Sequence, residues 1–265
     1  MPTRALRTAA SGMYAQELNI EVISNNIANI NTTAFKKNKA EFQDLMYQQV
    51  NVNPVNSTQA NSGVSSTTLQ IGNGVEPAST EKIFNQGDIT QTNNQLDMAI
   101  QGDGFFQVKK PDGTYAYTRD GSFKVDSQGK IVTSGGYILD PSITLDENTL
   151  GVTIGKDGSV TAQKVGGSSS VIGNIELVRF MNPGGLQALG DNLYGQTDAS
   201  GTPIIGTPGQ NGFGSVNQGY LESSNVDIVQ EMIAMITAQR AYEINSKTVQ
   251  TVEQMMQMAN NLKTS

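Results

Sequence analysis

Hydrophobic positions near the start of the chain recur every seven residues in two interleaved series. The first series is Leu6, Met13, Ile20 and Ile27. The second begins three positions later and has one polar member: Ala9, Gln16, Ile23 and Ile30. Such an a/d repeat over residues 3–30 predicts a helix of about 40 Å, at ~1.5 Å per residue, that packs along a helical partner.

A third heptad series predicts a second long helix over residues 226–262, with Ser224 or Asn225 as a suitable N-cap. The series consists of Ile228, Met235, Tyr242, Val249 and Met256. Other apolar residues surround this axis, and its clear polar stripe is Arg240, Glu243 and Lys247. Because a pair of such helices buries only about half of its apolar surface, we expect both helices to contact other chains as well.

Four asparagines gather near the end of the first helix, although asparagine is a poor helix former. Asn25 and Asn29 lie one turn apart and face away from the isoleucine stripe. An amide both donates and accepts, so it can bond across an interface without burying a charge. Asn31 suits the helix end. The polar positions assigned to subunit assembly, with one aromatic neighbour, are Asn25, Asn26, Asn29, Asn31, Phe35 and Asn245.

The pattern between the helices changes to a period of two, with Asp-Gly turns. Hairpins are predicted at Phe105–Lys109 with Thr114–Thr118, and around Lys156-Asp157-Gly158. The fold class expected is α+β: terminal helices that pair as an antiparallel coiled-coil-like bundle, with a central, mainly antiparallel β domain reached through extended linkers. The expected segments are 1–36 (assembly helix), 37–95 (extended linker), 96–190 (β domain), 191–224 (return linker with short strands) and 225–265 (assembly helix).

Composition excludes several kinds of chemistry. The 265 residues include no Cys and no His, so typical zinc, haem and iron–sulfur sites and Ser-His-Asp triads are not expected. The formal net charge of −7 makes nucleic acid an unexpected partner. No run of 18 apolar residues and no secretory signal pattern is present, so we expect no membrane insertion, and any export would have to proceed without a cleavable signal peptide.

The glycine and aspartate motifs favour turns over ligand sites. Gly102 and Gly104 precede a predicted strand, whereas a dinucleotide loop precedes a helix. The Asp-Gly pairs lack the spacing of a calcium loop. No catalytic, cofactor or metal residue is assigned. Asp88, Asp97 and Asp103 leave one alternative open, a secreted β-rich glycan-binding module or glycoside hydrolase that uses paired carboxylates.

Three stretches, in this order along the chain, resemble the bacterial flagellar rod and hook axial protein family. They are SNNIANINTTAFKKNKAEFQDLMYQ, MAIQGDGFFQV with YTRDGSFKVD, and QGYLESSNVDIVQEMIAMITAQRAYEINSKTVQTVEQMM. LMYQ, the polar stretch after it and LQIGNGVEP resemble the distal rod members most, with hook and proximal rod members as alternatives. The family usually has glycine before Phe35, where this chain has Ala34, so a positive φ there would strain the backbone.

The resemblance implies a structural subunit, not an enzyme, that polymerises helically into a hollow rigid shaft. The shaft would transmit torque from motor to hook and conduct exported subunits. Implied partners are further copies of the chain, proximal rod proteins, the hook or its junction, the peptidoglycan-ring and outer-membrane-ring proteins, and the flagellar export apparatus. The implied location is the basal-body rod where it crosses the periplasm. The polar segment 46–68, with Tyr47, Pro54 and Leu69, is predicted to stiffen the shaft by packing on neighbouring subunits.

Overall fold

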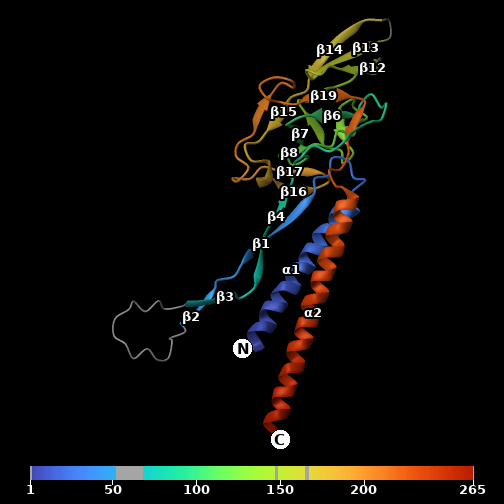
Figure 1. Ribbon diagram of the computed structural model, residues 1–265. Helices are drawn as coiled ribbons and strands as arrows, with labels where there is room; N and C mark the ends of the chain where they lie inside the picture. The colour runs from blue at the N-terminus through green and yellow to red at the C-terminus, as the bar shows by residue number, and fades with distance from the viewer. Residues whose placement is uncertain (1, 52–67, 147–148, 165–166, 265) are drawn as a thin grey trace. The chain divides into compact units, whose positions relative to one another are not determined.

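The computed structural model describes residues 2–51, 68–146, 149–164 and 167–264. The chain is α+β, with one long helix towards each end and a β-rich centre (Figure 1). It divides into two compact units. The first, here called the helical unit, comprises residues 1–25, 38–81 and 229–265; the second, the β unit, comprises 26–37 and 82–228.

The two helices provide most of the helical unit. α1 spans Pro2–Ala28 and α2 spans Ile228–Thr264, and they run side by side in opposite directions (Figure 1). At their contact a Cβ atom on Gly12 would lie 2.8 Å from Asn245 Nδ2. Both helices predicted from the heptads are confirmed.

The helix ends differ slightly from the prediction. α1 ends two residues early because the N–H groups of Asn29 and Ile30 donate to carbonyls three residues back, those of Asn26 and Ile27, both at 3.2 Å. This tighter turn closes the helix. α2 begins at Ile228, so the N-cap prediction at Ser224 or Asn225 is wrong.

Two short ribbons occupy the region predicted as an extended linker. β1 (Asn38–Asp44) pairs with β4 (Val75–Lys82), and β2 (Gln48–Asn51) pairs with β3 (Thr68–Ile71), both antiparallel. Gly74, with φ of +114°, lets the ribbon approach α1, because a Cβ there would lie 2.2 Å from Ser11 Oγ. Of the predicted stiffening residues, Tyr47 is exposed, Leu69 lies in β3, and Pro54 is outside the described residues.

The β unit is built from antiparallel pairs. Its large sheet has the order β16-β17-β8-β7-β11-β10-β9, with β15 joined to both β7 and β18. The strands of this sheet are β7 (Phe105–Lys109), β8 (Tyr115–Thr118), β9 (Phe123–Val125), β10 (Ile131–Thr133), β11 (Ile138–Asp140), β15 (Leu177–Arg179), β16 (Gln187–Gly190), β17 (Leu193–Gly195) and β18 (Ile204–Gly206). A short 3₁₀ helix, Pro183–Gly185, precedes β16. Both predicted hairpins are confirmed, with Gly113 and Gly158 at φ of +83° and +82°.

Smaller sheets complete this unit. One contains β12 (Thr149–Ile154), β13 (Ser159–Lys164) and β14 (Ser169–Asn174). Two pairs join distant segments: β6 (Met98–Gln101) with β19 (Ser215–Gln218), and β5 (Ile89–Gln91) with β20 (Tyr220–Glu222). Residues 191–224, predicted as a return linker with short strands, supply strands of the β unit. Their short runs lack a clear period of two, and distant partners complete their hydrogen bonds.

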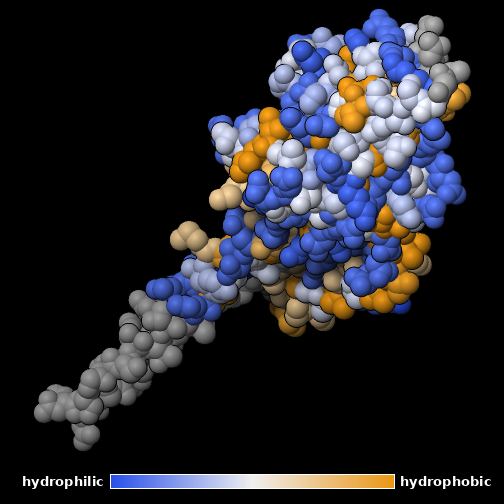
Figure 2. Space-filling model, turned by 90° about the horizontal axis from the view of Figure 1, so that it is seen from above, coloured by the Kyte–Doolittle hydropathy of each residue, from blue (hydrophilic) through white to orange (hydrophobic). Residues whose placement is uncertain are grey.

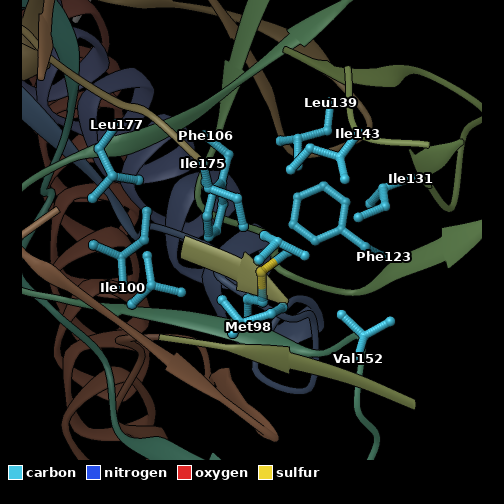
Figure 3. Close-up of a cluster of buried hydrophobic side chains, with 13 residues drawn as sticks. Met98, Ile100, Phe106, Phe123, Ile131, Leu139, Ile143, Val152, Ile175 and Leu177 are labelled. Carbon is cyan, nitrogen blue, oxygen red and sulfur yellow. The ribbon is translucent and has the colours of Figure 1, made fainter. Parts of the chain in front are cut away.

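The core of the β unit lies on both sides of β7. Phe106 packs edge-on against Phe123, with ring centroids 5.2 Å apart, in a fully buried cluster with Met98 and Ile100 (Figure 3). Its neighbour Phe105 points to the opposite side of the strand and joins a second cluster of aromatic and aliphatic residues. This alternation is the period of two read from the sequence.

Candidate functional site

The buried stripe of α1 follows the predicted heptads. Ala9 and Ile23 of the second series are buried. The first series, Leu6, Met13, Ile20 and Ile27, is partly buried. Ala15, from neither series, is also buried. Small residues at positions 9, 12 and 15 permit a close approach between backbones.

The buried line of α2 lies three residues later than the predicted series. Its members recur every seven residues: Glu231, Ala238, Asn245 and Val252, of which all but the partly buried Asn245 are buried. The predicted Met235, Val249 and Met256 flank this line and are partly buried. The predicted Ile228 and Tyr242 are exposed. Hydrophobicity did not reveal the buried line because it contains Glu, Ala and Asn.

The remaining surface of α2 is strongly apolar. Ten large apolar side chains on it are 40–81% exposed: Ile228, Val229, Met232, Ile233, Ile236, Tyr242, Ile244, Met255, Met258 and Leu262. Elsewhere exposed apolar residues are more scattered. In Figure 2, hydrophilic and near-neutral residues cover most of the visible face, and hydrophobic residues form separate patches. Exposed apolar residues in this number on one helix indicate association.

The asparagine group divides between exposed and buried positions. Asn25 and Asn31 are exposed, and Asn29 is partly buried and accepts a hydrogen bond from Thr32 Oγ1 at 3.1 Å. Asn26 is only 2% exposed. Phe35 is partly buried, with the Lys82 ammonium 5.3 Å from its ring centre. The amide that the fold buries most is therefore Asn26, rather than the Asn25 and Asn29 pair emphasised by the sequence.

A buried charge cluster in the β unit was not predicted. Lys36 Nζ lies 2.6 Å from Glu222 Oε1, and Arg119 Nε lies 3.4 Å from Glu222 Oε2. The side chains of Lys36 and Glu222 are fully buried, and Arg119 is 3% exposed. Burial lowers the pKa of the Lys36 ammonium, against the opposing effect of the Glu222 carboxylate. The cluster contains two cations and one anion.

Backbone contacts around this charge cluster fix three chain segments. Lys36 Nζ also donates to Asn85 O at 2.7 Å, and Gly87 N donates to Glu222 Oε1 at 2.9 Å. The Asn225 amide accepts from Lys37 N at 2.8 Å and donates to Ile83 O at 2.8 Å. Segments 33–37, 83–87 and 222–225 are thereby held together, although they are distant in sequence.

Ala34 occupies a strained position beside this cluster. Its φ is +55°, it is 1% exposed, and its N–H donates to Glu222 O at 2.8 Å. Ala34 thus has the positive φ that strains alanine, a question that the sequence had left open. The cost of this conformation for alanine is about 1 kcal/mol.

We expect Ala34→Gly to stabilise the β unit by about 0.5–1 kcal/mol, because relief of the left-handed strain exceeds the entropy added to the unfolded chain. Ala34→Val should instead destabilise it by about 2 kcal/mol, since a β-branched residue strongly disfavours this φ. Urea unfolding followed by near-ultraviolet circular dichroism measures both changes. A glycine variant less stable than the parent would contradict the strain argument.

One carboxylate of the hydrolase alternative, that of Asp97, has structural partners. Asp97 is buried and accepts hydrogen bonds from Thr92 Oγ1 at 2.6 Å and Asn94 Nδ2 at 2.9 Å. Within the described ranges, no group of three acidic residues is placed to hold a metal ion. No helix in that part of the chain has the length and apolarity to span a membrane.

Sequence reasoning missed Lys36, Arg119 and Glu222 as structural determinants, and it assigned Asn225 to a helix N-cap instead. All four stand within the stretches that carry the family resemblance, and this was the available signal. Their residue types gave no other sign, because Lys, Arg and Glu are usually exposed.

Three protein families match separate segments of this chain. Residues 6–36 match the family described as flagella basal body rod protein. Residues 99–162 match the flagellar hook protein FlgE/F/G D1 domain, and residues 217–262 match the flagellar basal body rod FlgEFG protein C-terminal family. The first of these covers most of α1, and the last covers the end of β19, β20 and most of α2.

Full-length relatives agree with these matches. A flagellar basal-body rod protein FlgG from Borreliella burgdorferi is 50% identical over 98% of both chains. Proteins of the same name from Caulobacter vibrioides and Bacillus subtilis are 48% and 37% identical, each over 98% of this chain and 99% of the relative. The chain therefore belongs to the FlgG family of flagellar basal-body rod proteins, the structural subunits of the distal rod.

Proposed function

We propose that this subunit self-assembles helically into a hollow, rigid drive shaft that transmits torque from motor to hook and conducts exported subunits. The exposed apolar surface of α2 is the observation that carries the proposal. Ten large apolar side chains on one helix exceed what a monomer normally leaves in water. A heterologous contact that repeats without closing produces a helical polymer.

In this polymer, α1 and α2 would pair as an antiparallel coiled-coil-like bundle and make the principal contacts between copies. The heptad spacing, the Gly12–Asn245 contact and the small residues along α1 support this pairing. The β unit has its own core. Segments 1–36 and 225–265 then act as assembly elements, as the sequence predicts.

Electron microscopy of concentrated protein tests the proposal. Filaments or tubes at high concentration are the expected result, because apolar helix faces associate by mass action. Monodisperse monomers across the accessible concentration range would argue against self-assembly.

The proposed shaft crosses the periplasm as part of the basal-body rod. Its proposed neighbours are proximal rod proteins below, the hook or its junction above, and peptidoglycan-ring and outer-membrane-ring proteins around it, with delivery by the flagellar export apparatus. Family membership and the resemblance in all three segments support this arrangement.

The asparagines of α1 should affect assembly more than folding. We expect Asn25→Leu combined with Asn29→Leu to leave the unfolding midpoint nearly unchanged but to reduce the yield of sedimentable polymer severalfold, since leucine cannot hydrogen-bond across an interface. Asn26→Leu is the matched control: Asn26 is buried, so its loss should lower stability itself. Normal polymer yield from the double variant would contradict the assembly role.

Segment 46–68 is proposed to stiffen the shaft by restricting sliding between neighbouring copies. Deletion of residues 48–65 should give shafts that bend, measured as a shorter persistence length in electron micrographs. A deletion of this length in a polar, nearly uncharged stretch removes little core. Shafts that stay straight after the deletion would disprove the stiffening role.

A further inference from the structure

Exposed charge on the two helices is confined to a few positions. Between Thr8 and Phe35 the only charged residues are Glu17 and Glu21, and both are exposed. Between Met232 and Val252 of α2, the charged residues are Arg240, Glu243 and Lys247, also exposed. We call these groups the acidic band and the basic band. Their formal charges are −2 for two glutamates, and +1 for two cations and one anion.

The two bands meet at one level of the helix pair. α1 and α2 run in opposite directions, and Gly12 contacts Asn245. Glu17 follows Gly12 by five residues, and Arg240 precedes Asn245 by five. At ~1.5 Å per residue both are displaced by about 7.5 Å in the same direction from the contact. Only Glu17 and Arg240 share this level, because Glu21 lies about 6 Å farther in that direction and Lys247 lies about 3 Å on the other side of the contact.

The bands do not neutralise each other within one chain. Arg240 Nη1 pairs with Glu243 Oε2 at 2.9 Å on the same helix. Within the described residues, the side chains of Glu17, Glu21 and Lys247 take part in no hydrogen bond or ion pair. Glu17 and Glu21 point away from the buried stripe of α1, so their carboxylates are directed away from α2.

We infer that the acidic band of one copy faces the basic band of a second copy and sets the axial register between neighbouring helix pairs. The inference rests on the proposed self-assembly and names its register device. Apolar heptad faces alone fit nearly as well after a slip of one repeat. A slip by one repeat would place charged side chains against an apolar helix face. The correct register instead places the acidic band of one copy against the basic band of the next. Because each copy offers one band of each sign, the contact is head-to-tail and repeats without closing.

Charge reversal that preserves each helix tests this inference. The basic band is reversed by Arg240→Glu with Glu243→Arg and Lys247→Glu, which keeps opposite charges at the i,i+3 and i,i+4 spacings. The acidic band is reversed by Glu17→Lys with Glu21→Lys. Helix content and thermal unfolding of each variant are compared with those of the parent by circular dichroism. Glu253→Lys is the matched control, because it lies on α2 outside the basic band.

The measured quantity is the lowest concentration of full-length protein that gives sedimentable polymer at low salt. Each reversal alone should raise it at least about tenfold, since like charges then face each other. For the chain that carries both reversals, the lowest polymer-forming concentration should return to within about threefold of the parent value. An equimolar mixture of the two singly reversed proteins should also polymerise, because each supplies the band that the other requires. Glu253→Lys should leave the value unchanged.

Several outcomes would overturn the inference while leaving the proposed function intact. One is polymerisation of either reversed variant at the parent concentration. Another is failure of both the combined variant and the mixture to recover, although their helix content and melting match the parent. Reversed variants that lose helix content without rescue in the mixture would assign the bands to folding instead. If the parent protein itself forms no polymer, the proposed function and this inference both fail.

Discussion

Glu222→Gln is expected to destabilise the β unit by about 3–5 kcal/mol, the usual cost of removing one partner from a buried ion pair. The neutral amide has nearly the same shape as the carboxylate, so packing changes little. It leaves Lys36 and Arg119 as two buried cations without an anion between them. Urea unfolding, followed by the near-ultraviolet signal of the buried Tyr117 and Tyr194, measures the loss.

Lys36→Met is the comparison for Glu222→Gln. It should destabilise the β unit clearly less, by about 1–2 kcal/mol. It removes one of two cations and leaves the neutral Arg119–Glu222 pair. The acceptors of Lys36 keep other donors: Gly87 N donates to Glu222 Oε1, and Asn225 Nδ2 donates to Asn85 O at 3.1 Å. The lowered pKa of Lys36 agrees that its burial as a cation is costly. Equal losses in the two variants would refute the charge-balance argument.

Replacement of Ile233 and Ile236 by glutamate should abolish polymer formation, with the assembly concentration raised more than about a hundredfold. Buried apolar anchors at interfaces commonly contribute about 2 kcal/mol or more each, and a buried unpaired carboxylate adds a further penalty. Both side chains are more than half exposed in the single chain, at 57% and 55%. The thermal unfolding of the monomer should therefore change little.

A matched control comes from the β unit. Val171 is 68% exposed on β14, and Val171→Glu introduces the same charge at a comparable apolar position outside α2. This variant should polymerise at nearly the parent concentration. If the glutamates in α2 left polymer formation unchanged while Val171→Glu abolished it, the principal contact between copies would lie on the β unit rather than on α2.

Much of the architecture followed from local patterns. The heptads of residues 3–30 and 226–262 predicted both helices, and Asp-Gly pairs located the turns of two hairpins. Period and turn chemistry act over a few residues, so they can be read directly from sequence. The three stretches of family resemblance also identified the axial protein family before any fold was known.

The candidate assembly surface was only partly predictable. The sequence indicated an excess of apolar surface on α2, but not which part remains exposed. The buried line of this helix passes through Glu231 and Asn245, because the partner surface on α1 is made of small residues such as Ala9 and Gly12. A prediction based on hydrophobicity favours large apolar side chains, so it assigned the contact to the adjacent line of Met235 and Val249.

The sequence by itself determined the α+β class, the two helices, the tight turns and the family. Only the tertiary structure decided the charge cluster of Lys36, Arg119 and Glu222, the left-handed backbone at Ala34, and the inclusion of residues 191–224 in the β unit. The reason is range: Lys36 and Glu222 are separated by 186 positions. Whether a charge is solvated or buried depends on which distant segments surround it, and a local sequence pattern does not identify those segments.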